Sequence, residues 1–207
     1  MGTTRIQVCN QALAHLGIGK RIADVDERSA EAEALKLFYE DAVDELLRDH
    51  DWPFARKKAA LVEVTDSTDD AHPDANWTYA YRYPADCLKA LRIDSGVRTD
   101  YRQARVSFDL MADTQGTMIM CDKEEAELEY SSTDARNPAR WSSDFALCLA
   151  YRLAAYIAPM LTKGDPFKIG QVSMTFFRMS RSKAEANAAN EVQPDEDPDS
   201  PLILSRL

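Results

Sequence analysis

The sequence predicts a mainly α fold with a β insertion, built as a four-helix bundle core, a small antiparallel β region and an extended C-terminal tail. Three observations lead to this prediction. Apolar residues recur at helical spacing near both ends of the chain, and side chains alternate with a period of two in its middle. After residue 190 the sequence becomes acidic and rich in proline. We therefore expect one folded domain over residues 1–190 and an extended arm over residues 191–207.

The first half of the bundle is expected to consist of two amphipathic helices. One spans about residues 4–16, where Thr4 and Gln7 can form a capping box at its start. The other spans about residues 29–49. It must end before Pro53, because the residue that precedes a proline disfavours helical geometry.

The second half of the bundle is expected to consist of two more helices near the C-terminus. One spans about residues 138–162, with Asn137 as its N-cap and a proline at its first position. Its apolar residues cover more than one face, which indicates the central helix of a bundle. The other spans about residues 166–190. Its apolar face is expected to contain Phe167, Val172, Phe176 and Met179.

Between the two pairs of helices, residues 77–131 predict an antiparallel β insertion. Trp77, Tyr79 and Tyr81 alternate with smaller or polar residues, which is the period of a half-buried strand. Turn residues separate the further short strands that we expect. These lie at residues 87–93, 104–110, 117–121 and 126–130.

Composition and charge restrict the class of protein. Hydrophobic residues make up 45% of the chain, which is enough for a core, and the net charge is -10. A protein that holds DNA by its phosphates needs the opposite sign. The basic cluster Arg56-Lys57-Lys58 is interpreted as a solvated surface patch. No apolar run approaches the roughly 18 residues of a membrane span, and we expect no signal peptide.

A search for catalytic or metal-binding motifs yields none with the required spacing. His15, His50 and His72 lack neighbouring ligands, so we expect no metal and no cofactor. The four cysteines are interpreted as small buried hydrophobic residues. Two carboxylate pairs lie four residues apart on the second helix, Glu40 with Asp44 and Asp41 with Glu45, and they are interpreted as solvated charges. A glycosidase would need two carboxyls facing each other across a cleft.

Aromatic residues are the remaining candidates for a site. Trp77, Tyr79 and Tyr81 fit a sugar-binding or base-stacking surface, but such a strand more often faces a core or a subunit interface. We assign the same pair of alternatives, core or subunit interface, to Trp52 and Phe54.

Three blocks of sequence carry a resemblance to a known family. The first is Ile6–Gly17 (IQVCNQALAHLG), followed by Arg21-Ile22. The second is Phe38–Ala55, which ends in Trp-Pro-Phe-Ala, and the third is Tyr79–Leu88 (YAYRYPADCL), followed later by Leu153–Ala158. In this order and spacing, the chain resembles the tail tubular protein A and tail accessory factor family of short-tailed bacteriophages.

The resemblance implies a structural protein of the virion and not an enzyme, because the family has no catalytic residues to carry over. Its members are adaptors at the head-to-tail junction. They form a ring, usually of twelve copies, that binds the portal protein on one side and the tail nozzle or tail tube protein on the other. The genome DNA passes through the channel without tight binding. We expect this chain to be made in the host bacterial cytoplasm and to act in the virion.

The resemblance also suggests a role for the C-terminal arm. Family members use C-terminal extensions to dock on the portal, and this chain ends in an apolar segment behind an acidic spacer. The expected portal-binding residues are Pro201, Leu202, Ile203, Leu204, Arg206 and Leu207. A frayed terminus without function is the alternative.

Two other functions remain open from the sequence. One is a virion-associated peptidoglycan hydrolase that uses the acidic residues of the second helix. The other is a head-completion protein of a long-tailed phage, since such adaptors share the helical core.

Overall fold

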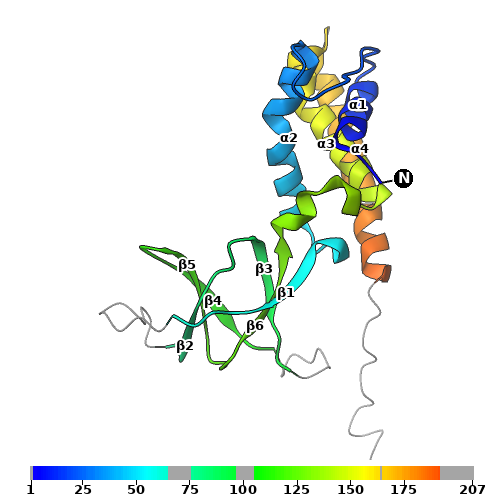
Figure 1. The fold of residues 1–207 in the computed structure, drawn as a ribbon. Helices are drawn as coiled ribbons and strands as arrows, with labels where there is room; N and C mark the ends of the chain where they lie inside the picture. Colours follow the sequence, from blue (N-terminus) through cyan, green and yellow to red (C-terminus); the bar gives the residue numbers. More distant parts are fainter. Residues whose placement is uncertain (1, 65–75, 97–104, 164, 192–207) are drawn as a thin grey trace, which may run out of the picture.

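The computed structural model describes residues 2–64, 76–96, 105–163 and 165–191, in which helices and strands occupy separate regions (Figure 1). The α-helices are α1 (Arg5–His15), α2 (Ala30–Asp49), α3 (Ser143–Leu161) and α4 (Pro166–Glu191). The strands are β1 (Arg56–Ala60), β2 (Tyr79–Arg82), β3 (Cys87–Ile93), β4 (Phe108–Asp113), β5 (Gly116–Cys121) and β6 (Glu127–Ser132).

The prediction of a mainly α fold with a small β region is wrong, because the protein is an α+β fold. Two three-stranded antiparallel sheets stand beside the four helices and enclose a hydrophobic core of their own. The sequence analysis underestimated the extent of the β structure for two reasons. It omitted β1 altogether, and it treated the remaining strands as an appendage of the helical core.

The helical region is organised around α3, which packs against α1, α2 and α4. Nine side chains of α3 are buried, as the apolar character of this helix predicts. By length and composition α3 also fits a membrane span, but in the fold it is the central helix of the bundle. The other helices cover its buried side, while Leu147 and Met160 remain exposed.

The N-terminal ends of α1 and α2 form as the sequence predicts. Thr4 and Gln7 make the reciprocal hydrogen bonds of a capping box. Ser29 accepts a hydrogen bond from the backbone N–H of Ala32 and caps α2. Gly17 takes a positive φ of 73° just after α1, where a residue with a side chain would be strained.

The start of α3 differs from the prediction. Asn137 caps a short 3₁₀ helix over Pro138–Arg140, and the α-helix begins only at Ser143, with Ser142 as its N-cap. Between the two, Trp141 is extended, and its buried indole N–H donates to the backbone oxygen of Ala135 at 2.6 Å. Anchoring this side chain prevents one continuous helix from residue 138.

The face that α4 turns to the bundle also differs from the prediction. Its buried residues are mostly small, and Gly170 brings the helix so close that an added Cβ would lie 3.4 Å from the backbone oxygen of Ala155 on α3. The large apolar residues predicted to be buried would hold the two helices apart. Instead they are exposed to solvent, and they are Phe167, Val172, Phe176 and Met179.

The two antiparallel sheets form a barrel-like β region, called the barrel below. One sheet has the order β1-β6-β3 and the other β2-β5-β4. Two bridges join their edges, Glu63 with Tyr81 on one side and Ile93 with Val106 on the other. Glu63 lies beyond β1 and Val106 lies before β4, so the two sheets are joined next to these strands, around a shared core.

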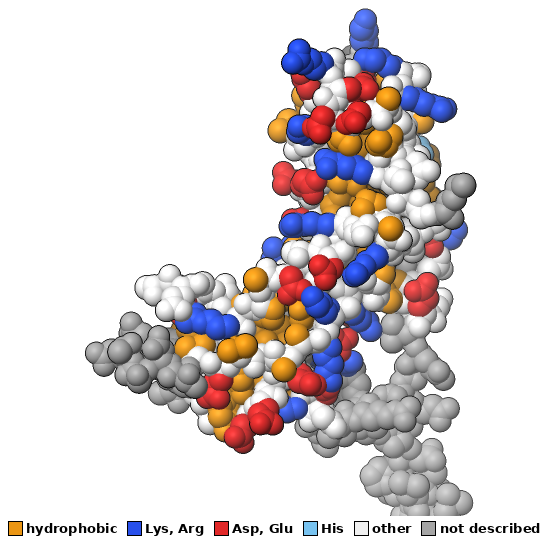
Figure 2. Space-filling view, viewed as in Figure 1, with side chains coloured by type: hydrophobic (Ala, Val, Ile, Leu, Met, Phe, Trp, Pro, Cys, Tyr) orange, Lys and Arg blue, Asp and Glu red, His pale blue; other side chains and the backbone are white. Residues whose placement is uncertain are grey.

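The chain passes between barrel and bundle through two neighbouring strands. Strand β1 leaves the bundle after Trp52, and β6 returns to it beside β1, with Arg56 paired to Ser131. The barrel is thus an insertion in the bundle (Figure 1). The space-filling view of the same side shows charged side chains of both signs over the helical region (Figure 2).

Candidate functional site

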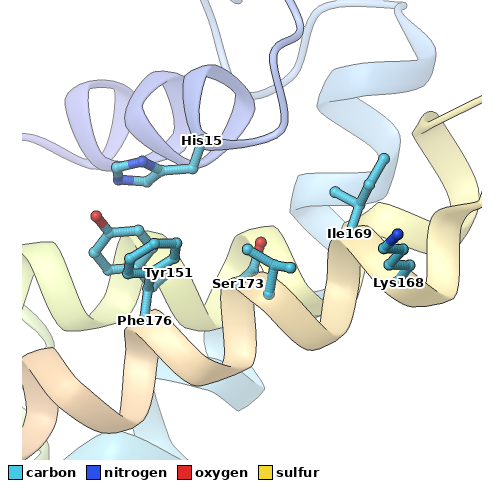
Figure 3. A pocket seen from close by; sticks show the side chains of 7 residues that line it. His15, Tyr151, Lys168, Ile169, Ser173 and Phe176 are labelled. Carbon is cyan, nitrogen blue, oxygen red and sulfur yellow. The ribbon is translucent and has the colours of Figure 1, made fainter.

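A groove lies between α1 and α4, with α3 as its floor (Figure 3). It has a volume of about 290 Å³. The groove exists because α1 and α4 both pack on α3 and leave a gap above it. Its lining is His15, Tyr151, Lys168, Ile169, Val172, Ser173 and Phe176.

A stack of three aromatic side chains forms one end of the groove. His15 of α1 lies over Tyr151 of α3, with ring centroids 4.0 Å apart, and Tyr151 lies over Phe176 of α4 at 5.6 Å (Figure 3). Partial burial lowers the pKa of His15, because the charged imidazolium loses hydration there. Neutral His15 therefore extends the apolar surface at neutral pH.

Beside the groove, α4 exposes a row of apolar side chains to solvent. Val172, Phe176 and Met179 are 49%, 48% and 65% exposed. Their spacing of four and three residues places them on one line of the helix. Lys168 and Lys183 continue this line at either end. We call these five residues the α4 row.

The α4 row is the feature of the described surface that most clearly indicates a binding site for another protein. Large exposed apolar residues that gather on one face commonly mark a protein contact, whereas scattered ones do not. The sequence contained these residues, but their helical spacing was interpreted as a core-facing stripe. Only the small residues on the opposite side of α4, such as Gly170 and Ala184, signalled which face packs.

Of the aromatic candidates near the second helix, Trp52 lies in the bundle core. It is 1% exposed, and its indole N–H donates to the backbone oxygen of Leu46 at 2.8 Å. Phe54 is half-buried at the edge of the same core, and both rings contact Phe145. Trp52 is thus part of the packing that ends α2, and Phe54 is the more accessible of the two.

The aromatic candidates of the barrel have different environments. Tyr81 is fully buried in the barrel core, and its hydroxyl donates to the backbone oxygen of Lys123 at 2.7 Å. Tyr79 is half-buried beside it, with ring centroids 6.3 Å apart. Trp77 is half-buried just before β2. The three residues do not form one exposed aromatic surface.

Arginines hold most of the carboxylates on α2. Asp44 accepts two hydrogen bonds from Arg136, at 2.7 and 2.6 Å, and Glu45 accepts from Arg152 and from the hydroxyl of Tyr156. Glu40 pairs with Arg5 at 3.0 Å. Asp41 points to solvent without such a partner. The carboxylates serve as links between helices and do not face each other across the groove.

The basic cluster Arg56-Lys57-Lys58 lies on β1, where Lys57 and Lys58 are exposed at the surface and all three residues form ion pairs. Lys57 contacts Asp86 at 2.5 Å and Asp134 at 3.3 Å. The ammonium group of Lys57 holds the pKa of Asp86 below its usual range, as do hydrogen bonds from Tyr130 and Ser132. The remaining pairs are Arg56 with Asp51 and Glu129, and Lys58 with Asp94 and Glu127.

Within the described ranges, no group of three potential metal ligands comes together. Cys9, Cys121 and Cys148 are buried and Cys87 is half-buried, all of them as free thiols. Burial raises the pKa of Cys9 to about 11. Outside the described residues lie His72 and the predicted portal-binding residues, which are Pro201, Leu202, Ile203, Leu204, Arg206 and Leu207.

No protein-family model matches the chain, and no curated protein is significantly similar to it.

Proposed function

We propose that this protein is a head-to-tail adaptor of a tailed bacteriophage, a ring subunit that binds the portal protein and joins it to the tail. The observation that carries the proposal is the exposed α4 row beside the groove, a surface whose apolar side chains become buried when another chain covers it. The sequence resemblance implies the type of assembly, a ring at the head-to-tail junction. Neighbouring copies, the portal and a tail protein are the proposed partners.

The positions of the resembling blocks support this proposal. Ile6–Gly17 forms α1 and its end, Phe38–Ala55 forms the second half of α2 and the Trp52 turn, and Tyr79–Leu88 forms β2 and the start of β3. Leu153–Ala158 lies on the central helix. The blocks thus contribute to both cores and to the junction between them, as a resemblance in architecture requires.

The test is binding to the portal protein that the same genome encodes. The chain and the portal are purified, mixed, and analysed by size-exclusion chromatography with light scattering. We expect a large complex with about one chain per portal subunit, as stacked coaxial rings of equal symmetry require. Failure to associate at any salt concentration would overturn the proposal.

A second experiment tests the arm proposed from the sequence. Deletion of residues 201–207 is expected to leave folding intact and to prevent stable portal attachment. Burying the four aliphatic residues of the arm stabilises by about 1.5–3 kcal/mol each. Fixing the backbone costs about 1–2 kcal/mol per residue, so one arm binds weakly and many arms on a ring bind tightly. Circular dichroism checks folding, and attachment of the truncated chain at full strength would refute the role of the arm.

The hydrolase alternative receives no support from the geometry of α2. Asp44 and Glu45 are engaged by arginines, and Asp41 lies exposed on the same helix and not across a cleft from them. A wall-lysis assay distinguishes the two functions. If Asp41→Asn with Asp44→Asn and Glu45→Gln removed a lytic activity of the wild-type chain, the adaptor proposal would have to be abandoned.

A further inference from the structure

The α4 row lies on the exposed side of α4 and borders the groove, where Phe176 stacks on Tyr151. Lys168, Val172, Phe176, Met179 and Lys183 follow one another at intervals of four, four, three and four residues. The two lysines have no acidic partner among the residues that the structure describes. The α4 row is therefore an apolar strip with an unpaired positive charge at each end.

The outward face of α2 has the complementary character. Glu33, Leu37, Asp41, Asp44 and Arg48 follow one another at the same intervals as the residues of the α4 row, and we call them the α2 row. Leu37 is 61% exposed. Glu33 and Asp41 lie one turn before and after it, and neither has a cationic partner in the described part of the chain.

The overall charges of the two helices are also opposite in sign. Helix α2 contains seven acidic and two basic side chains. Helix α4 contains four basic and two acidic side chains. Many of these charges are already paired within the chain, including Asp44 with Arg136 and Arg181 with Asp49.

On the two rows, the carboxylates without an ion-pair partner over the described stretches of the chain are Glu33 and Asp41 on α2. The ammonium groups without one over the same stretches are Lys168 and Lys183 on α4. Contact of α4 with α2 brings these opposite charges together, whereas contact of α4 with α4 brings the lysines together.

We infer that the α4 row of one copy docks on the α2 row of a second copy. In this contact Leu37 packs on Val172 and Phe176 at the groove. A carboxylate lies four residues from Leu37 in both directions, and Lys168 lies four residues from Val172. Whichever way the two helices run, a carboxylate therefore comes close to Lys168.

This contact is heterologous, since each copy uses two different surfaces. Helices α2 and α4 both pack on α3 and lie on different flanks of it (Figure 1). Each copy therefore has one row free after pairing, and addition of further copies gives a closed ring if the rotation between them closes. That the copies close into a ring rests on the proposed function. The inference adds which surfaces form the contact between neighbouring copies.

The test is site-directed disulfide formation in the full chain, alone and bound to the portal. Chains with Leu37→Cys and chains with Val172→Cys are mixed and oxidised mildly. We expect disulfide-linked dimers in the mixture and none in either variant alone. Both positions are exposed, so neither change disturbs the core. Wild-type chain measures the background of the native cysteines, three of which are buried.

Phe167→Cys is the matched control, because Phe167 is 73% exposed on the same helix but lies off the α4 row. It should form no linked dimer with Leu37→Cys. Charge reversal gives an independent check: Lys168→Glu weakens association, and chains that carry Glu33→Lys and Asp41→Lys restore it when they are mixed with that variant.

The outcomes separate this inference from the proposed function. Linked dimers without portal binding would refute the adaptor function and leave the contact standing. Portal binding without linkage of Leu37→Cys to Val172→Cys, both in solution and on the portal, would refute the contact alone. Linkage of Val172→Cys to itself would show an α4–α4 contact and would also overturn the inference.

Discussion

At the scale of single residues, Trp52 shows how one buried side chain fixes the end of a helix. Its indole fills the core beneath α2, and its N–H satisfies the backbone oxygen of Leu46 in the last turn. The proline that follows prevents the helix from continuing. A hydrogen bond and a packed ring thus define where the bundle ends and the path to the barrel begins.

Replacing Trp52 tests this role. Trp52→Ala should lower the free energy of unfolding by about 3–5 kcal/mol, because it leaves a cavity and an unsatisfied carbonyl. Trp52→Phe should cost less, since most of the packing remains. Urea unfolding followed by circular dichroism measures both. Half-buried Trp77 is the control, and an equal loss in Trp77→Ala would contradict the special position of Trp52.

Asp86 is a second residue whose contacts have a measurable consequence. Its depressed pKa means that the folded state binds the proton more weakly than the unfolded state does. The carboxylate therefore stabilises the fold above the unfolded pKa of about 4, and this stabilisation is lost as the pH falls through the folded pKa.

We expect Asp86→Asn to lower the stability of the protein at pH 7, and to lower it by a smaller amount at pH 3. Urea midpoints at the two pH values provide the measurement. Asp41→Asn, at an exposed carboxylate without an arginine partner, serves as the control and should leave both midpoints unchanged. A variant of Asp86 with the same acid sensitivity as the wild type would show that Lys57, Tyr130 and Ser132 contribute little through this carboxylate.

The sequence was informative at this scale where a residue has a local role. The capping box of Thr4 and Gln7 could be predicted because all its partners lie within one turn. The ion pairs of Lys57 could not, since Asp86 and Asp134 are distant in sequence and meet it only when β1, β3 and β6 pair. Local partners are therefore visible in a single sequence, whereas distant ones are not.

At the scale of elements, α4 shows why apolar spacing alone misidentified the packed face. Helices pack closely where small residues allow their backbones to approach, and Gly170, Ser173 and Ala184 provide that face. The large residues of the α4 row made the stronger periodic pattern in the sequence. Apolar residues at helical spacing can be buried by a second chain as well as by the core of their own chain.

Gly170 tests this explanation. Gly170→Leu should destabilise the protein by about 1–3 kcal/mol, because its side chain meets Ala155 and Ala158 of α3. Thermal unfolding measures the change. Gly19→Leu is the matched control, since a Cβ at Gly19 has no atom within 4 Å. Equal stability of the two variants would mean that α3 and α4 do not pack closely at this point.

The strands were predicted better than their arrangement. Four of the five expected strands after residue 77 overlap observed ones closely, and residues 87–93 match β3 at both ends. Strand β1 was missed because Arg56-Lys57-Lys58 shows no apolar alternation. Its charged side chains are stabilised by acidic partners on neighbouring elements and not by burial.

At the scale of the whole molecule, two hydrophobic cores lie in one chain, one in the bundle and one in the barrel. Leu149 is fully buried in the first and Leu128 in the second. Because the two clusters share no residue, we expect them to respond separately to damage. The sequence could not indicate this division, since the contact between the two sheets depends on bridges between distant residues, such as Glu63 with Tyr81.

Matched substitutions test this separation. Leu128→Ala and Leu149→Ala should each cost about 2–5 kcal/mol in their own core. Native-state hydrogen exchange should show lost protection mainly in the strands for Leu128→Ala and mainly in the helices for Leu149→Ala. If either variant lowered protection evenly over both regions, the two cores would form a single cooperative unit.

The pairing of β1 with β6 has a consequence for how such a chain can change over evolutionary time. The two connections to the barrel lie side by side, with Arg56 opposite Ser131, and every fully buried residue of the bundle core lies outside residues 57–130. A genetic exchange that replaced this stretch with another module, with ends as close together as two paired strands, would leave the bundle core complete. The barrel can thus diversify as a cassette while the helical frame is conserved.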